Sequence, residues 1–365
     1  LCHIRYDGII VINDTIMVKT ANHNLNLSTQ INYITHMNRT PFIVTVFGFE
    51  HALASAITGA LDLFAFAGIS WQRIHHQRPT PQFTVQLASS HGQPIVCSNQ
   101  LTLTPHLAIE DVAHTDILLI PTIGGDIDTV LQNNANQLVQ LRRLHKQGAD
   151  IAANCTGTFL LAETGILNDK VATTHWGYAD KFKARYPMVN VQPDKMVTED
   201  NSVFCAGGGM AWIDLALLLI ERYCGNGIAS DTAKSHVLDL SRANQTAYAS
   251  SRQFKFHQDK DILAVQHYID AHLHTPMTLN ELAGKHNLTE RTLIRRFKHA
   301  CGFTPLQYLQ RIRLERARKL LETTHAPIES IVNQIGYEDL SSFSRLFKKN
   351  TSLSPSQYRS KFQRF

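Results

Sequence analysis

The C-terminal part of the chain repeats itself with a period of 50 residues, and this repeat limits the possible folds more than any other feature. Each copy has the pattern of a short helix, a turn and a second helix. A repeated supersecondary unit of this kind predicts two helix-turn-helix units with the same architecture. The 50-residue shift superposes Leu282 on Val332, Arg295 on Arg345, Phe297 on Phe347, Lys298 on Lys348, Pro305 on Pro355, Gln307 on Gln357 and Tyr308 on Tyr358.

The second helix of each unit has one apolar face. Leu293 lies four residues before Phe297, and the second copy has an equivalent pair of phenylalanines. Residues four apart lie on the same face of a helix, so these pairs are expected to be buried. The opposite face then points to solvent and is available to bind DNA. It carries three arginines: Arg291, Arg295 and Arg345.

A long helix is expected between the two units. Thr304 has the residue type of an N-cap, and Pro305 suits the first helical position. Up to Leu321, such a helix would span roughly 25 Å at about 1.5 Å per residue. It would space two recognition helices about one turn of DNA apart, near 34 Å, so one chain would enter successive major grooves. The alternative is a helical bundle with a basic surface.

Charge is distributed unevenly between the two parts of the chain. Residues 259–365 contain 17 Lys and Arg against 10 Asp and Glu, whereas residues 1–258 contain 18 against 20. The basic excess is therefore entirely C-terminal. This distribution favours a polyanionic partner for the C-terminal part and a small or neutral ligand for the N-terminal part. A solvated basic face is the plainer interpretation of the charge alone.

The N-terminal part alternates strand-like and helix-like segments. This order predicts an α/β domain with a mostly parallel sheet flanked by helices. We expect an extension at 1–38, an α/β domain at 39–225, a connector at 226–258 and an all-α domain at 259–365. Strand-like apolar runs occur at 41–48, 83–89, 116–121, 149–155, 170–175 and 202–208.

Several features exclude other classes of protein. The six cysteines show neither paired spacing nor a ligand cluster, so neither a disulfide framework nor a metal site is expected. No apolar run approaches the roughly 20 residues of a membrane span. We therefore expect a soluble cytoplasmic protein. Residues 1–38 are expected to be disordered or to reflect a misplaced start, unless the stretch at 7–14 adds a strand.

The C-terminal motifs identify a resemblance. The stretches "RRFKHACGFTPLQYLQRIRLERARKLL" and "IGYEDLSSFSRLFKKNTSLSPSQYR" resemble the AraC/XylS-type DNA-binding domain over about 260–365. The resemblance implies contacts to base edges of double-stranded DNA. Apolar residues among the contacts would touch thymine methyl groups. The implied DNA-binding residues are Arg291, Ile294 and Arg295 in the first recognition helix, and Leu340, Ser341, Ser344 and Arg345 in the second.

The N-terminal motifs resemble a second family. The segments "IPTIGGD", "NCTGTFLLAETGIL", "ATTHW" and "CAGGGMAWIDLALLLIE" are similar to the PfpI/ThiJ group of the class I glutamine amidotransferase-like superfamily, with a flavodoxin-like sheet, over roughly 40–225. The order of the two parts resembles GlxA-type transcriptional regulators, several of which sense small nitrogen compounds such as betaines, carnitine or arginine. This implies a bacterial, nucleoid-associated activator. It would form a homodimer, bind a small effector and contact RNA polymerase, without a cofactor.

Cys155 lies where this superfamily places a nucleophile, on a turn between a strand and a helix. A working cysteine also needs a base. Thr156 stands where hydrolytic members often carry histidine, and Leu53 stands where others carry an acid. We therefore expect a ligand pocket and no catalytic residue; the alternative is a cysteine-dependent amidase or glyoxalase-like enzyme. Backbone amides would bind an anionic group and Trp176 a cationic one. The candidate effector-binding residues are Gly124, Gly125, Cys155, Thr156, Gly157, His175 and Trp176.

Overall fold

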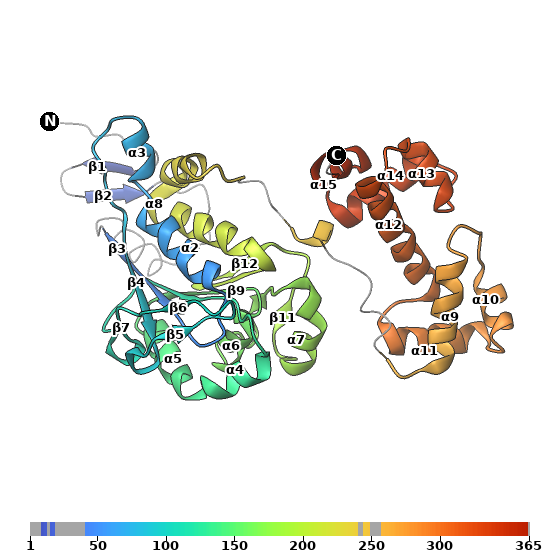
Figure 1. The fold of residues 1–365 in the computed structure, drawn as a ribbon, viewed down its shortest axis with the longest axis horizontal. Helices are drawn as coiled ribbons and strands as arrows, with labels where there is room; N and C mark the ends of the chain where they lie inside the picture. Colours follow the sequence, from blue (N-terminus) through green and yellow to red (C-terminus); the bar gives the residue numbers. More distant parts are fainter. Residues whose placement is uncertain (1–8, 13–14, 19–40, 240–243, 249–256, 364–365) are drawn as a thin grey trace.

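The computed structural model describes residues 9–12, 15–18, 41–239, 244–248 and 257–363. Figure 1 shows an α/β unit, a helical region and a short 3-10 turn, η6 (Thr246–Tyr248), on the chain between them. The α/β unit has one hydrophobic core, and the helical region has two separate cores. The expected fold class, an α/β part followed by two helix-turn-helix units, is confirmed.

The α/β unit is built on a seven-stranded sheet with the order β12-β13-β9-β8-β3-β4-β7. All neighbouring strands are parallel except β12 and β13. The central strands are apolar runs buried on both faces, as expected where helices cover both sides of a sheet. The strands are β3 (Phe42–Phe47), β4 (Phe83–Ser89), β7 (Leu107–Ala108), β8 (Ile117–Ile120), β9 (Asp150–Asn154), β12 (Val197–Asp200) and β13 (Val203–Ala206).

One expected strand lies outside this sheet. The run at 170–175 forms only β10 (Val171–Ala172), which pairs with β11 (Asn190–Val191) in a sheet of two strands. The strand pairing stops before two threonines whose hydroxyls bind carbonyls of distant segments: Thr173 donates to Lys195 O and Thr174 to Cys155 O. The hairpin of β5 (Ile95–Val96) and β6 (Thr102–Leu103) was not expected from the sequence.

Helices cover both faces of the seven-stranded sheet (Figure 1). Helices α2 (Ala54–Ala65) and α8 (Trp212–Ser235) pack together on one side. Packing in this core extends past residue 225, where we expected the connector to begin, because Ala229 and Ala233 of α8 are buried in it. The other helices of the unit are α3 (Ser70–Ile74), α4 (Ile127–Asn133), α5 (Leu138–Lys146), α6 (Gly157–Glu163) and α7 (Ala179–Arg185).

Part of the expected N-terminal extension is described. Strand β1 (Ile9–Ile12) pairs with β2 (Thr15–Val18) in an antiparallel hairpin of their own. The hairpin is a separate sheet, so the stretch at 7–14 does not add a strand to the seven-stranded sheet. The other residues of the expected extension, and part of the expected connector, lie outside the described residues.

The helical region has the two-unit organisation that the sequence repeat predicts. Each helix-turn-helix unit has its own core, and the long helix α12 contributes Leu309 to the first core and Leu314 to the second. The region consists of α9 (Lys260–Ala271), α10 (Leu279–Lys285), α11 (Glu290–Cys301), α12 (Pro305–Thr323), α13 (Ile328–Gln334), α14 (Leu340–Thr351) and α15 (Pro355–Phe362).

The ends of the helices repeat as well as their cores. Helices α12 and α15 both begin with a capping box and a proline. Helices α11 and α14 both end at a residue with left-handed backbone. The equivalent pairs are the N-caps Thr289 and Asp339, the left-handed residues Gly302 and Ser352, and the capping boxes Thr304–Gln307 and Ser354–Gln357.

Membrane insertion finds no support in the helices. Within the described ranges, none of them combines the length and the apolar character that a bilayer span demands.

Candidate sites at the cysteine turn and on the recognition helices

Cys155 occupies a strained turn between β9 and α6. Its φ angle is +57°, in the left-handed region that residues with a side chain rarely adopt. Two hydrogen bonds hold this conformation: the Cys155 amide donates to Ala206 O at 2.9 Å, and the Thr174 hydroxyl donates to Cys155 O at 2.7 Å. The side chain is almost fully buried, with 4% exposed. Such strain persists where the surroundings enforce it, often at functional sites.

Gly157 allows the turn to approach the end of β8. A Cβ atom at this position would lie 2.2 Å from Pro121 O. No side chain fits there, so this glycine is required by packing. Its amide is at the first position of α6, where the helix itself supplies no acceptor.

The thiol of Cys155 has no basic partner among the described residues. In the described ranges, the one side chain within hydrogen-bonding range of its Sγ atom is Thr156, whose hydroxyl lies at 3.9 Å and also donates to Ile123 O at 2.8 Å. Leu53 is the N-cap residue of α2 and supplies no charge. The geometry of a nucleophile turn is therefore present, but the part of the chain that the structure describes places no proton acceptor on the thiol.

One of the two glycines of the preceding loop, Gly124, has its amide engaged away from the thiol. The Gly124 amide donates to His51 O at 2.8 Å, so its hydrogen is already used. A Cβ atom at Gly125 would lie 2.7 Å from the Cβ atom of His51. Both glycines are exposed. They allow this loop to approach Ser98 and His51 closely, because an added Cβ atom at Gly124 would lie 2.3 Å from Ser98 Oγ. Our expectation for Gly124 as an amide donor beside Cys155 is wrong.

Asn154, the last residue of β9, is a buried polar residue at this turn that was not among the site residues predicted from the sequence. Its side chain is 3% exposed, and its amide group donates to Thr122 Oγ1 at 2.6 Å. Its Oδ1 atom is buried without a hydrogen-bond partner in the described part of the chain. A buried acceptor without a donor costs about 1–3 kcal/mol. The available signal was a polar residue at the end of an apolar strand, directly before the candidate cysteine.

His175 has a structural role in the loop after β10. Its Nδ1 atom accepts a hydrogen bond from the Gly177 amide at 2.9 Å. Burial lowers the pKa of His175, which favours the neutral ring with its proton on Nε2. The ring also lies over Gly208, where an added Cβ atom would be 2.4 Å away. Trp176 is half-buried beside it, with ring centroids 5.1 Å apart.

Gln245, from the expected connector, reaches the same loop. Its side chain is 2% exposed and accepts hydrogen bonds from the Trp176 and Gly208 amides. Nothing in the local sequence marks this glutamine, because its two contacts reach residues that are 69 and 37 positions away.

The recognition helices α11 and α14 present the faces expected from the repeat. The apolar residues Leu293, Phe297, Phe343 and Phe347 have no exposed surface. The expected DNA-binding residues lie on the other side of the helices. Arg291, Arg295, Leu340, Ser341 and Arg345 are exposed, and Ile294 and Ser344 are half-buried.

The outward arginines are not held in ion pairs. Within the described residues, Arg291, Arg295 and Arg345 form no salt bridge. Arg345 donates to Ser342 Oγ at 3.3 Å, and the pKa of Asp339 is lowered mainly by hydrogen bonds from Ser342 and to a smaller extent by the charge of Arg345. Arg296 behaves differently, because its guanidinium lies 2.6 Å from Asp259 Oδ1 and holds the pKa of that carboxyl below its usual range. The outward guanidinium groups therefore remain available to phosphates or base edges.

The spacer helix α12 holds the two units together through Arg313. The Nε atom of Arg313 donates to Leu273 O at 2.6 Å, its Nη2 atom donates to Thr275 O at 2.9 Å, and the guanidinium lies 5.3 Å from the Tyr337 ring centroid. Leu273 and Thr275 follow α9, whereas Tyr337 belongs to the second unit. Arg313 is therefore a bridge between the units, whereas Lys319 on the same helix is exposed.

Comparison with known families supports both halves of this description. The family described as DJ-1/PfpI matches residues 70–222, and the family described as Helix-turn-helix domain matches residues 282–361. The first match includes the cysteine turn, and the second includes both recognition helices.

Relatives with known names share both parts. The chain is 30% identical to the HTH-type transcriptional regulator CdhR of Pseudomonas aeruginosa, covering 74% of this chain and 80% of that protein. It is 29% identical to the HTH-type transcriptional regulator GlxA of Rhizobium meliloti, covering 75% and 81%. Isonitrile hydratase of Pseudomonas putida is 32% identical, covering 45% of this chain and 68% of that enzyme.

The relatives that match over both parts are named as regulators and not as enzymes. This agrees with a cysteine turn at which no base is found among the residues that the structure describes. The chain belongs to the family of HTH-type transcriptional regulators in which a DJ-1/PfpI domain precedes an AraC-type helix-turn-helix domain, and it is a DNA-binding regulator.

Proposed function

We propose that both helix-turn-helix units of this regulator read base sequence. The observation that carries this proposal is that Arg295 and Arg345, equivalent under the repeat, are both exposed on helices with matching buried faces. An exposed arginine on a recognition helix can bind guanine O6 and N7 with two hydrogen bonds. Beside them, Arg291, Ser341 and Ser344 add polar contacts, and Ile294 and Leu340 contact thymine methyl groups.

The spacing of the units supports their insertion into successive major grooves. Helix α12 has 19 residues, which corresponds to about 28 Å at about 1.5 Å per residue. Arg313 fixes the first unit relative to the second. One chain then covers two grooves on one face of the DNA. A footprint of the purified full chain tests this arrangement, and protection of one groove only would contradict it.

We further propose that the regulator is a homodimer on paired half-sites and activates transcription by contacting RNA polymerase. The division of charge supports a separate role for the α/β part, which carries no basic excess for DNA. Sedimentation of the full chain with and without a two-site DNA tests the dimer. A single chain bound per two-site DNA would contradict it.

The cysteine turn is proposed as the binding site of a small nitrogen-containing effector. Asn154 supports this proposal, because its buried Oδ1 atom accepts no hydrogen bond from the described residues and would be satisfied by an N–H group of a ligand. Cys155 and Thr156 line the same turn, and the ring of Trp176 can contact a cationic group. The amide of Gly157 would contact an anionic group, whereas Gly125 contributes only to the shape of the neighbouring loop.

A thermal-shift screen of the full chain against amino acids, betaines, amines and polyamines tests the effector site. A ligand at 100 times its Kd stabilises the folded protein by about 2.7 kcal/mol. Cys155→Ser should retain DNA binding and change the response to that ligand. Asn154→Ala should weaken the shift, because the acceptor is lost. Cys155-dependent turnover of amides, isonitriles or 2-oxoaldehydes at enzymatic rates would instead favour the cysteine-enzyme alternative.

A further inference from the structure

Residues 244–248 contact the α/β unit through Gln245. The carboxamide Oε1 atom accepts from the Gly208 amide at 3.0 Å and from the Trp176 amide at 3.3 Å. The Nε2 atom donates to Thr174 O at 2.8 Å and to Lys195 O at 3.2 Å. Both ends of one side chain are therefore satisfied by the α/β unit, and the side chain is 2% exposed.

The site around this side chain is specific for a primary carboxamide. It presents backbone N–H groups to one atom and carbonyl oxygens to the other, which matches an amide and no other side chain of this size. A carboxylate would place an oxygen against the carbonyls of Thr174 and Lys195. The backbone is held too, because the Gln245 amide donates to Asp194 O at 2.9 Å. We call the residues Thr174, Trp176, Lys195 and Gly208 the carboxamide cradle.

The residues on either side of Gln245 contact the second helix-turn-helix unit. Ala247 is 8% exposed and belongs to that unit's hydrophobic core. The Tyr248 ring lies 5.4 Å from the Phe362 ring in an edge-on arrangement. Arg318 of α12 donates to Thr246 O at 3.2 Å, and Asn244 donates to the Ser352 hydroxyl. One five-residue segment thus contacts two units at once, with Gln245 buried against the α/β unit and Ala247 buried in the second helix-turn-helix unit.

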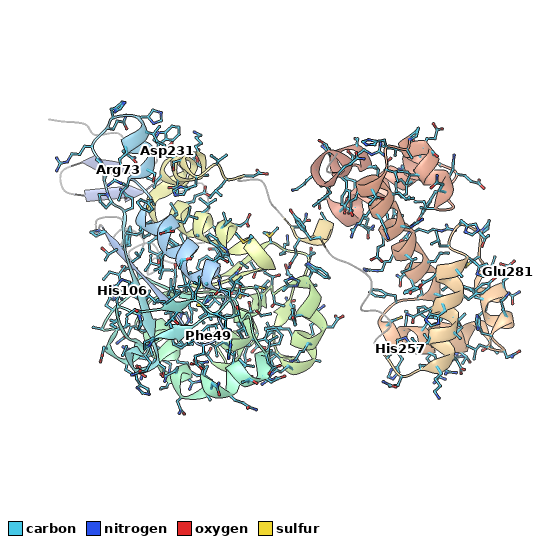
Figure 2. All side chains as sticks on the ribbon, in the orientation of Figure 1. Phe49, Arg73, His106, Asp231, His257 and Glu281 are labelled. Carbon is cyan, nitrogen blue, oxygen red and sulfur yellow. The ribbon has the colours of Figure 1, made fainter. Side chains whose placement is uncertain are left out.

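We propose that residues 244–248 form an intramolecular latch, in which the Gln245 carboxamide in its cradle holds the second helix-turn-helix unit next to the α/β unit. The first unit lies farther from the α/β unit. Glu281, on α10 of the first unit, lies at the edge of the helical region that points away from the α/β unit (Figure 2). The latch therefore acts on one of the two DNA-binding units and restricts where the other can lie.

The cradle is also linked to the cysteine turn. Thr174 offers its carbonyl to Gln245 and donates its hydroxyl to Cys155 O. A displacement of that loop would change both contacts. This link gives the latch a regulatory consequence, which rests on the proposed effector site, whereas the latch itself does not depend on any effector.

Hydrogen exchange in the full chain without effector tests the latch. Gln245→Ala removes the acceptor for the Trp176 and Gly208 amides, and exchange at 173–177 and 206–209 should rise about tenfold, as for loss of about 1.4 kcal/mol of hydrogen bonding. Gln245→Glu should act in the same direction. Gln132→Ala, which changes an exposed glutamine on α4, is the matched control and should leave exchange unchanged.

Small-angle scattering of the same proteins, in the same oligomeric state, measures the separation of the units. Release of the latch should broaden the distribution of distances for Gln245→Ala and Gln245→Glu. An unchanged distribution would overturn the proposal. So would faster exchange spread through β9, because Gln245 would then be a core residue of the α/β unit.

A substitution at Gly207, on the α/β side of the contact, tests the position of Gln245 independently. The three heavy atoms nearest to an added Cβ atom at Gly207 all belong to Gln245, each 2.8 Å away. Gly207→Ala should therefore release the latch in the wild-type chain and have little further effect in a Gln245→Ala chain. Equal effects of Gly207→Ala in both backgrounds would contradict the contact. None of these readouts involves an effector, so the latch and the proposed effector site can fail separately.

Discussion

The two helix-turn-helix units share their framework and differ in what is attached to it. Both have the same N-cap and C-cap positions and a buried pair of residues four apart on the recognition helix. At one equivalent position they diverge: Arg296 pairs with Asp259 in the first unit, whereas Leu346 packs against the core in the second. The second unit also receives Ala247 from the connector. Caps and core phenylalanines thus specify the fold, and the flanking positions are free to serve different contacts.

The largest effects should come from the equivalent core residues. Phe297→Ala and Phe347→Ala each remove a fully buried ring and should cost about 3–5 kcal/mol of folding free energy. Because the units have separate cores, faster hydrogen exchange should concentrate in the mutated unit and the adjoining part of α12. Leu306→Ala, on the exposed side of α12, should change stability little. Equal opening of both units by either phenylalanine change would show that they fold as one.

Arg313→Ala should break the connection between the units. Loss of its two hydrogen bonds to carbonyls should cost about 1.5–3 kcal/mol, the usual value for bonds from a charged group. Affinity for DNA should fall on all sequences, without a change of preferred base, because the relative position of the recognition helices is disturbed. Binding-site selection measures this; a relaxed preference at one base pair would instead place Arg313 on the DNA.

A smaller effect should appear in the pH dependence of stability, because the first unit has the Arg296–Asp259 ion pair and the second unit has Leu346 at the equivalent position. The Arg296 guanidinium lowers the pKa of Asp259, so this carboxylate stabilises the fold above the pKa of its unfolded form. That contribution is lost as the pH falls through the lowered folded-state pKa. Between pH 5 and pH 2, exchange in α9 and α11 should rise less in Arg296→Leu than in wild type. The same rise in both proteins would show that the pair contributes nothing.

The smallest effect should come from the N-terminal hairpin. Strands β1 and β2 form their own sheet, so a shortened chain beginning at Arg39 should melt at the same temperature and bind DNA equally well. Melting curves and a binding titration measure this directly. A loss of several degrees would show that residues 1–38 are part of the fold.

Sequence patterns predicted those features that local chemistry specifies. The repeat predicted the paired cores, because Phe297 and Phe347 recur with helical spacing. Short apolar runs predicted most central strands, because a strand buried on both faces is apolar along its length. The strand at 170–175 was misplaced because Thr173 and Thr174 bind carbonyls from distant segments. Gln245 was missed because its contacts depend on tertiary placement, and the bridging role of Arg313 depends on its partners in both units.

The central claim is that both units read DNA, and one binding-site selection tests it most directly. Each of Arg295→Ala and Arg345→Ala should cost about 1–3 kcal/mol on the specific site and relax the preference at a different base pair. Those two base pairs should lie about ten base pairs apart on one face of the DNA. Lys319→Ala, the control, should alter no base preference. If Arg345→Ala leaves affinity and preference unchanged while Arg295→Ala abolishes both, the second unit only supports the first, and the account is wrong.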